Sequence, residues 1–405
     1  MSRIDDVVVQ FCPGGVQFET LSNLLERGTN IRWDDVADEE FQYIDLTSVD
    51  RVTRSIGATE TIRRDNAPSR AQQVVREGDV LFGTTRPMLK RYCVVPAEYD
   101  RQIASTGYCV LRPKQDHILT NYLFHVIGTA RFYAYVEANE RGASYPAIPD
   151  SVVKEFRIPV PPLEVQREIG RVLDQFTELE AELEAELEAR RRQYVFYRDS
   201  LLLGTDVPKV AMGELGTFIR GRRFTKNDVV ESGIPSIHYG EIYTDYGVSA
   251  SYALRDVSSN IANQLRFAQP RDVIFAGVGE TVEDVGKAVA WLGDEPVAVH
   301  DDTFSFTSDL NPKYVAYAVQ TGDFHSQKAN YVARGKVKRL SALGLTKIKI
   351  PVPSAEEQER IVSILDKFDT LLNDPSIGLP AELTARRTQY EYYRDKLLSF
   401  EESVT

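Results

Sequence analysis

The sequence predicts an α+β protein in which two mixed α/β domains alternate with two long helices, and these helices pair as an antiparallel coiled coil. Three observations lead to this fold class. The 405-residue chain repeats itself, two of its segments carry long apolar stripes of helical period, and the remaining segments hold short strand-like runs. Two tandem copies of one pattern predict a pseudo-twofold internal repeat.

The repeat is clearest in two blocks. Ten of nineteen positions are identical between IPVPPLEVQREIGRVLDQF, which starts at Ile158, and IPVPSAEEQERIVSILDKF, which starts at Ile350. Thirteen of eighteen are identical between the blocks that start at Ala185 and Ala381. The offset grows from 192 to 196 residues, so the second copy carries a four-residue insertion, which lies within Asn373–Pro380. The chain therefore contains two tandem copies of one sequence pattern.

Residues 158–204 and 350–405 are predicted to be helical spacers. In the first, apolar residues recur every three or four positions from Ile169 to Leu201, and ELEA occurs three times within Glu178–Ala189. In the second, Asp374-Pro375 must interrupt the helix. Neither helix can bury its stripe alone, so we expect them to pack together, with pairing between two chains as the competing possibility.

Residues 1–157 and 205–349 are predicted to be mixed α/β domains. They contain the strand-like runs DVLFG, YCVLRP, DVIFAG, AVAWLG and TFSFTS, separated by turn clusters. Helical sequence lies between them, for example NYLFHVIGTARFYAYVEA from Asn121. The runs show no βαβ regularity, which argues against a doubly wound parallel sheet.

Composition argues against membrane proteins, exported proteins and proteins stabilised by disulfides or zinc. No run of eighteen apolar residues exists and the N-terminus lacks an export signal, so we expect a cytoplasmic protein without membrane association. Cys12, Cys93 and Cys109 have unrelated spacings, which argues against a disulfide scaffold or a Cys-rich zinc site. The helical segments carry net charges of −4 and −5 out of a total of −12, so the α/β domains are close to neutral.

Two pairs of corresponding loops are the best candidates for binding DNA. Gly83–Arg86 and Ala276–Gly279 each follow a strand, and Arg141–Tyr145 and Arg334–Lys338 each contain Arg-Gly. Glycine lets the backbone approach closely, and arginine can bind a phosphate or a guanine edge. The alternative is that these arginines and lysines are ordinary solvated surface residues without a binding role. With a further basic cluster, the candidate residues are Thr84, Thr85, Arg86, Arg141, Gly142, Ser144, Tyr145, Arg220, Arg222, Arg223, Lys226, Gly277, Arg334, Gly335, Lys336 and Lys338.

This arrangement resembles the specificity subunit of type I restriction–modification enzymes. The resemblance rests on two variable regions, each ended by IP-x-P, a Gln and an LD-x-F helix, and then by Q-Y-x-x-Y-R-D-x-LL. It is strong in the helical segments and only architectural in the variable ones. It implies that each variable domain is a target-recognition domain that reads one part of a split double-stranded DNA site. The helices would set the gap between the two parts and dock two methyltransferase (modification) subunits, and restriction subunits (ATP-dependent nucleases) would join that complex.

The resemblance implies that the chain performs no chemistry and holds no cofactor or metal. The alternative is a DNA methyltransferase or nuclease with its own recognition domains, and a coiled-coil adaptor is a second rival. FAGVG at Phe275–Gly279 and NPKY at Asn311–Tyr314 loosely resemble methyltransferase motifs, but each is missing from the other copy of the repeat. His300, Asp301 and Asp302 could hold a metal, although a turn before TFSFTS explains them better. No P-loop is present in the sequence.

Overall fold

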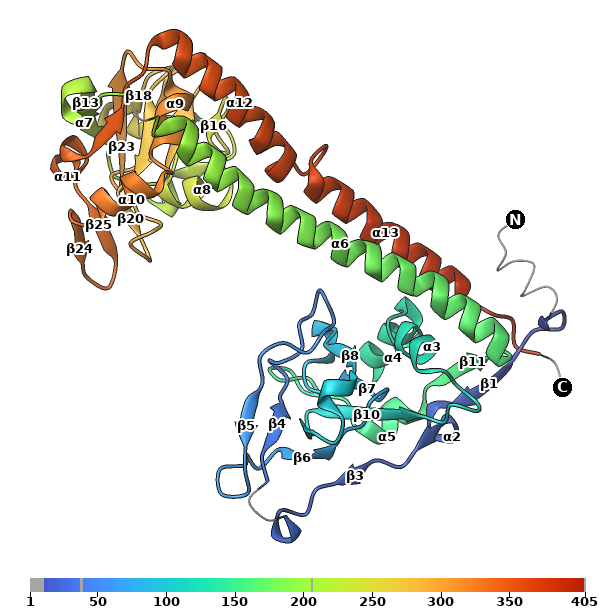
Figure 1. Ribbon diagram of the computed structural model, residues 1–405. Coiled ribbons are helices and arrows are strands. Elements are labelled where there is room, and N and C mark those ends of the chain that lie inside the picture. Colours follow the sequence, from blue (N-terminus) through green and yellow to red (C-terminus); the bar gives the residue numbers. More distant parts are fainter. Residues whose placement is uncertain (1–10, 37–38, 205–206, 404–405) are drawn as a thin grey trace. The chain divides into compact units, whose positions relative to one another are not determined.

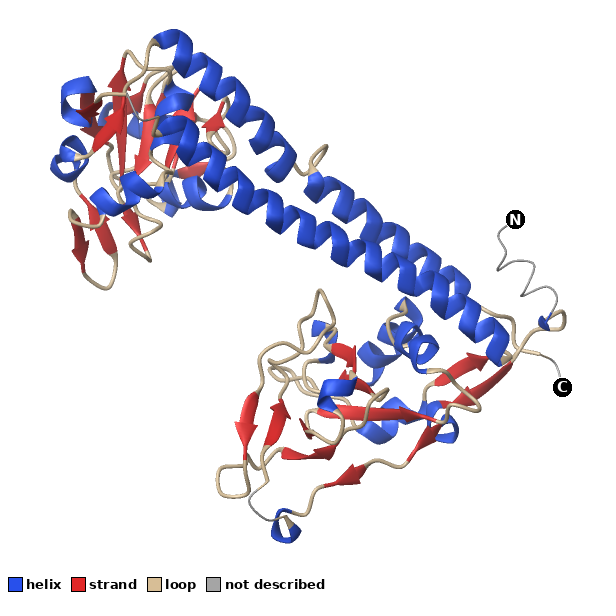
Figure 2. Ribbon diagram, in the orientation of Figure 1, coloured by secondary structure: helices blue, strands red, loops and turns tan. Residues whose placement is uncertain are grey.

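The computed structural model describes residues 11–36, 39–204 and 207–403, which form two compact units. Unit 1 comprises Met1–Ala185 with Ala381–Thr405, and unit 2 comprises Glu186–Pro380. Each unit contains one α/β domain and parts of the helical segments (Figures 1 and 2). None of the described helices combines the length and apolar character that a membrane crossing needs.

The domain of unit 1 is built from small, mostly antiparallel sheets. Its strands are β1 (Gln17–Thr20), β2 (Leu25–Glu26), β3 (Thr29–Asn30), β4 (Phe41–Ile44), β5 (Glu60–Ile62), β6 (Ala71–Val74), β7 (Val80–Gly83), β8 (Tyr92–Val94), β9 (Ile103–Ser105), β10 (Tyr108–Pro113) and β11 (Arg157–Val160). They form sheets of order β3-β6-β9-β4-β5 and β2-β10-β7-β8 and the pair β1-β11. Its helices and 3₁₀ turns are α2 (Leu21–Leu24), η1 (Trp33–Asp35), η2 (Pro87–Leu89), η3 (Ala97–Tyr99), α3 (Thr120–Val126), α4 (Ala130–Asn139) and α5 (Asp150–Glu155).

The domain of unit 2 repeats this plan with more strands. They are β12 (Lys209–Ala211), β13 (Gly216–Arg220), β14 (Val229–Val230), β15 (Ile234–Ile237), β16 (Ser249–Ala250), β17 (Arg255–Val257), β18 (Phe267–Ala268), β19 (Val273–Ala276), β20 (Val278–Gly279), β21 (Ala288–Trp291), β22 (Val297–Val299), β23 (Thr303–Ser308), β24 (Val332–Arg334), β25 (Lys338–Leu340) and β26 (Lys349–Pro351). The sheets have the orders β13-β23-β19-β21-β16, β14-β17-β15-β22-β18, β20-β25-β24 and β12-β26. The helices and turns are α7 (Met212–Leu215), η4 (Lys226–Asp228), α8 (Tyr239–Thr244), η5 (Ser259–Gln264), α9 (Pro312–Ala318), α10 (Gly322–Lys328) and α11 (Ala342–Lys347).

The helical segments form α6 (Leu163–Leu202), α12 (Ala355–Asn373) and α13 (Leu379–Leu397). In unit 1 the first part of α6 packs on α13, where Phe176 stacks on Tyr393 at 5.6 Å between ring centroids. Farther along α6, Glu180 pairs with Arg387. Residue numbers rise along one helix and fall along the other, so these two segments are antiparallel.

In unit 2 the second part of α6 packs on α12. The rings of Tyr194 and Tyr197 lie 6.2 and 6.1 Å from the ring of Phe368. Helix α12, which carries Phe368, ends at Asn373, and α13 begins at Leu379. The break expected at Asp374-Pro375 is therefore confirmed.

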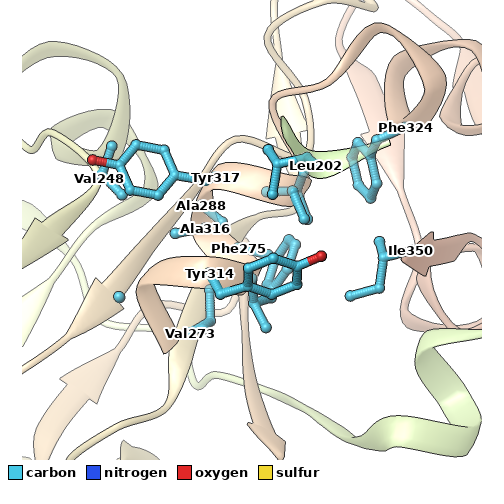
Figure 3. Close-up of a cluster of buried hydrophobic side chains, with 14 of the residues drawn as sticks. Leu202, Val248, Val273, Phe275, Ala288, Tyr314, Ala316, Tyr317, Phe324 and Ile350 are labelled. Atoms are coloured by element: carbon cyan, nitrogen blue, oxygen red, sulfur yellow. The ribbon is translucent and has the colours of Figure 1, made fainter. Parts of the chain in front are cut away.

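The core of unit 2 joins sheet, short helix and long helix (Figure 3). Phe275 from β19, Tyr314 from α9 and Leu202 from the end of α6 belong to one buried cluster. Unit 1 has the same arrangement, with Phe82 of β7 and Ile169 of α6 in one cluster. Each domain therefore buries part of a long helix as well as its own sheet.

The junction between each domain and its helix repeats in atomic detail. The Gln166 side chain accepts a hydrogen bond from the Leu119 backbone N–H at 2.9 Å, and its amide donates to the carbonyl of Pro161 at 2.8 Å. Its counterpart Gln358 accepts from the Asn311 N–H at 2.9 Å and donates to Pro353 at 3.0 Å. Both glutamines are buried, so the repeat seen in the sequence is a repeat of structure.

The predicted fold class is confirmed, with one local difference. The helical stretch from Asn121 is divided into α3 and α4 around Gly128. The Thr129 hydroxyl caps α4 by accepting a hydrogen bond from the Phe132 N–H at 3.2 Å. A threonine cap starts a new helix and lets the chain change direction.

Candidate nucleic-acid interface

In unit 1 the two predicted loops come together as the rim of a small hairpin. Arg141 and Ala147 exchange two backbone hydrogen bonds of 2.9 Å, and Gly142 turns the chain with φ +104. Thr85, which follows β7, forms a bridge with Ala147 on the other side. The separate sequence segments 83–86 and 141–147 therefore form one surface.

Arg86 is the most conspicuous side chain on this surface. Its backbone is left-handed, with φ +49, and its N–H donates to the Pro146 carbonyl at 2.7 Å. Its guanidinium lies over the ring of Tyr145, 4.3 Å from the centroid, and that tyrosine is 70% exposed. Tyr145 belongs to the hairpin turn, and Arg86 contacts it from the loop that follows β7.

The other candidates of unit 1 have mixed roles. Ser144 and the Arg141 side chain are exposed at the hairpin. Thr84 is buried, and its hydroxyl donates to the Gly107 carbonyl at 2.9 Å. Thr84 therefore shapes the loop from inside, which its position in the sequence did not indicate.

In unit 2 the corresponding loops also come together. β20 pairs with β25, and β25 pairs with β24, so Gly279 lies opposite Lys338 and Arg334 lies opposite the same residue from the other side. The Gly277 carbonyl accepts from the Leu340 N–H at 2.9 Å. In both units, therefore, a hairpin pairs with the segment that follows an inner strand of a sheet, which is β7 in unit 1 and β19 in unit 2.

Close packing explains the glycine between β19 and β20. A Cβ at Gly277 would lie 2.6 Å from the ring of Phe304. At the hairpin tip, Gly335 and Lys336 are exposed, and the Lys338 ammonium donates to the Gly335 carbonyl at 3.0 Å. The backbone of Arg334 ends β24, and its side chain lies outside the described part of the structure.

One member of the basic cluster Arg220, Arg222, Arg223 and Lys226 lines a groove of about 480 Å³ beside this hairpin. Arg220 donates to the Asp301 carbonyl at 2.6 Å, and Arg339 pairs with the Asp302 carboxylate at 3.1 Å. Both arginines line the groove. Arg222, Arg223 and Lys226 are exposed in the loop that follows β13.

The acidic turn between these arginines fits a structural role better than a metal site. His300, Asp301 and Asp302 lie with their ligand atoms within 4.8 Å of one another. However, Asp302 is engaged by Arg339, and His300 Nδ1 accepts from the Asp302 N–H at 3.2 Å. Burial lowers the pKa of His300, although both carboxylates oppose that shift. The turn leads directly into β23, as expected.

The two methyltransferase-like motifs also have structural roles. The Asn311 side chain caps α9 by accepting from the N–H groups of Lys313 and Tyr314. The Tyr314 hydroxyl is buried and donates to the Pro351 carbonyl at 3.0 Å. Phe275 of FAGVG is a buried core residue. These residues build the domain.

A family model for the type I restriction modification DNA specificity domain matches residues 49–189 and again residues 205–385. The chain belongs to this family. The two matches fall in the two copies of the internal repeat, so each half of this specificity protein is one family domain.

Relatives and solved structures agree with this assignment. A Haemophilus influenzae protein named as specificity subunit S.HindORF215P of a type I restriction enzyme is 30% identical over 310 residues, which cover 71% of this chain and 74% of the relative. The EcoR124I/EcoR124II specificity subunit of Escherichia coli is 35% identical over 265 residues, 62% of this chain and 65% of its own length.

Two solved chains share the fold of this specificity protein. One comes from work on complex assembly and conformational transition of the type I R-M system, with a TM-score of 0.69, 24% identity and coverage of 96% and 98% of the two chains. The other is the HsdS subunit from Thermoanaerobacter tengcongensis, with a TM-score of 0.50, 24% identity and coverage of 95% and 97%. Both likenesses concern the fold alone.

Lys90, Tyr239 and Tyr243 of this specificity protein were not predicted as candidate site residues. Lys90 has a left-handed backbone, with φ +54, and its ammonium lies 5.0 Å from the Tyr133 ring. In unit 2, Tyr239 and Tyr243 line a second cavity, of about 700 Å³, together with Lys336. Neither feature has a sequence signature, because each depends on segments far apart in the chain.

Proposed function

We propose that this chain is the DNA-reading subunit of a type I restriction–modification complex, and that each unit reads one part of a split double-stranded site. The observation that carries the proposal is the convergence of the same two loops in both halves, at the rim of one hairpin per unit. Two similar basic surfaces on one chain suit two short half-sites, because a DNA reader needs charge for phosphates and donors for base edges.

The proposed target-recognition domains are residues 1–157 and 205–349. The exposed hairpin residues would touch DNA, whereas Thr84 and Gly277 would hold the loops in shape. Arg220 is held in an ion pair with Asp301 and would approach a phosphate together with its carboxylate neighbour. The chain would supply recognition and no chemistry, with no cofactor or metal.

The helical spacers, residues 158–204 and 350–405, would dock two methyltransferase subunits, and restriction subunits would join them. Supporting this, each unit exposes one aromatic pair on a long helix. Phe196 is 68% exposed beside Tyr197, and Tyr392 is 61% exposed beside Tyr393. These pairs occupy equivalent positions in the repeat. Equivalent apolar patches on acidic helices suit two copies of one partner with a basic rim.

Such a complex would act on double-stranded DNA in the cytoplasm. The test of the proposal uses the full-length chain with a pool of randomised duplexes, from which bound molecules are sequenced. We expect two short defined sequences separated by a gap of fixed length and undefined sequence. Binding without any sequence preference would contradict the proposal.

We also propose that α6 sets the gap, because it is a single helix of 40 residues. Four residues inserted after Ala189 lengthen an α-helix by about 6 Å and turn it by about 40° beyond a full turn. That length corresponds to one or two base pairs at about 3.4 Å each. The half-sites should keep their sequences while the gap grows by one or two base pairs, and an unchanged gap in a fully active protein would contradict this role.

A further inference from the structure

The loop that follows β7 presents Arg86 against the unit 1 hairpin, and the position of this arginine is fixed at both its backbone and its guanidinium. The left-handed backbone of Arg86, with φ +49, is a conformation that residues with a Cβ rarely adopt. The hydrogen bond from its backbone N–H to the Pro146 carbonyl, 2.7 Å long, holds it there. Strain of this kind persists where the surrounding structure imposes it, and it gathers at functional sites.

The guanidinium is fixed as well. It lies 4.3 Å from the centroid of the Tyr145 ring, and the paired backbone of Arg141 and Ala147 holds the hairpin that carries this ring. Stacking leaves the edge of the planar guanidinium, with its N–H donors, free to bind a partner.

Those donors have no carboxylate partner among the described residues. This distinguishes Arg86 from Arg220 and Arg339, whose guanidinium groups are paired with Asp301 and Asp302. An exposed, oriented and unpaired guanidinium fits a planar acceptor pair such as O6 and N7 of guanine. A phosphate contact would need only a positive charge, which a flexible lysine supplies without a strained backbone or an aromatic support.

We propose that Arg86 reads a guanine in the half-site of unit 1, with Tyr145 as the positioning residue that orients it. This inference rests on the proposed function. It applies to one unit only, because the repeat places Gly279 of unit 2 at the position of Arg86. The two half-sites are therefore read with different chemistry, and the guanine contact belongs to the first.

The test compares variants of the full-length chain in selection from randomised duplexes. Arg86→Gly removes the side chain, and it should fold because glycine adopts φ +49 without strain. We expect it to lose the preference for guanine at one position of one half-site, with a loss of about 10- to 100-fold in affinity for the selected site. Arg86→Lys should lose the same preference, because lysine lacks the bidentate fork.

Two further variants isolate the role of the ring. Tyr145→Phe keeps the aromatic face and should keep the preference, whereas Tyr145→Ala should weaken it. Arg101→Ala is the matched control, since Arg101 lies in the same domain, has a left-handed backbone with φ +59 and an 86% exposed side chain. It should change nothing.

The outcomes separate this inference from the proposed function. A wild-type chain without a split motif would overturn both. A split motif that survives unchanged in Arg86→Gly would mean that Arg86 makes no base contact. A loss of affinity that is equal on all duplexes and is restored in Arg86→Lys would mean a phosphate contact. Either result would overturn the guanine assignment alone.

Discussion

In unit 1 the buried ring of His125 lies 2.8 Å from the Asp174 carboxylate and 2.9 Å from the Tyr390 hydroxyl. In unit 2 the repeat places Tyr317 at that position, and its hydroxyl donates to Asp366, the counterpart of Asp174, at 2.8 Å. The residue has changed, but the donor to the helix carboxylate has stayed. The junctions between domains and helices are thus one design used twice.

The two hairpin surfaces differ in which charged side chains they present and in whether these are paired. Unit 1 presents an unpaired Arg86 on Tyr145, whereas unit 2 presents Lys336 at the tip and arginines paired with Asp301 and Asp302. The halves agree where they must hold helices and differ where they would meet DNA. This division is what a protein needs if it reads two different half-sites from one scaffold.

The largest effect should come from breaking the shared junction. Gln166→Ala and Gln358→Ala each remove the partner of a part-buried backbone N–H and of a carbonyl, at a cost of about 1–3 kcal/mol per group. We expect each variant to lose about 2–4 kcal/mol in free energy of unfolding, measured by urea denaturation. The exposed Gln72→Ala should stay within about 0.5 kcal/mol of wild type. A loss in only one of the two junction variants would show that the junctions are not equivalent.

A smaller effect should come from the hairpin tip of unit 2. Lys336 is exposed beside a cavity, so its ammonium suits a phosphate. Lys336→Ala should weaken binding by about 1 kcal/mol on all sequences and lower the salt slope by about one. Lys367→Ala, on the exposed face of α12, is the control and should leave both quantities unchanged. A loss confined to particular sequences would instead indicate base reading by Lys336.

The smallest effect concerns pH and is confined to unit 2. Burial, and then the neighbouring His300, lower the pKa of His238 to about 4. The ordinary value in an unfolded chain is about 6.5, so the unfolded state binds more protons between these values. Stability should therefore fall as the pH drops from about 6.5 to 4. His238→Asn should reduce this loss, because asparagine binds no proton in this pH range. Its side chain can still accept from the Gly240 N–H at the start of α8, so the helix cap is kept.

The two tryptophans allow the pH dependence of stability to be measured in each unit separately. Trp291 reports on unit 2 in a Trp33→Phe background, and Trp33 reports on unit 1 in a Trp291→Phe background. Urea unfolding followed by fluorescence at pH 6.5 and 4.5 should show the His238→Asn effect at Trp291 alone. An equal effect at both reporters would mean that the units do not respond independently.

Much of the fold could be predicted from the sequence, because it follows from local rules. Apolar spacing along α6 and the proline after Asp374 are properties of the chain itself, and the repeat supplied the correspondence between halves. The loops could be selected as candidates because Arg-Gly recurs at matched positions, 141–142 and 334–335, but their convergence could not be read from the sequence.

The details of the candidate surface could not be predicted, because they depend on tertiary packing. Thr84 looked like an exposed loop residue and is buried under Gly107. Arg220 and Arg339 lie in separate sequence clusters, and only the fold places Asp301 and Asp302 between them. Charge counts in the sequence do not show which arginines are already paired.

If each unit reads its own half-site, exchanging one domain should change one half-site only. Residues 1–157 can be exchanged for the first domain of another family member, with α6 and unit 2 left intact, and the selected duplexes sequenced for both proteins. We predict that one half-site changes completely while the other half-site and the gap stay the same. A change in both half-sites, or a folded chimera without sequence preference, would contradict two independent readers on one scaffold.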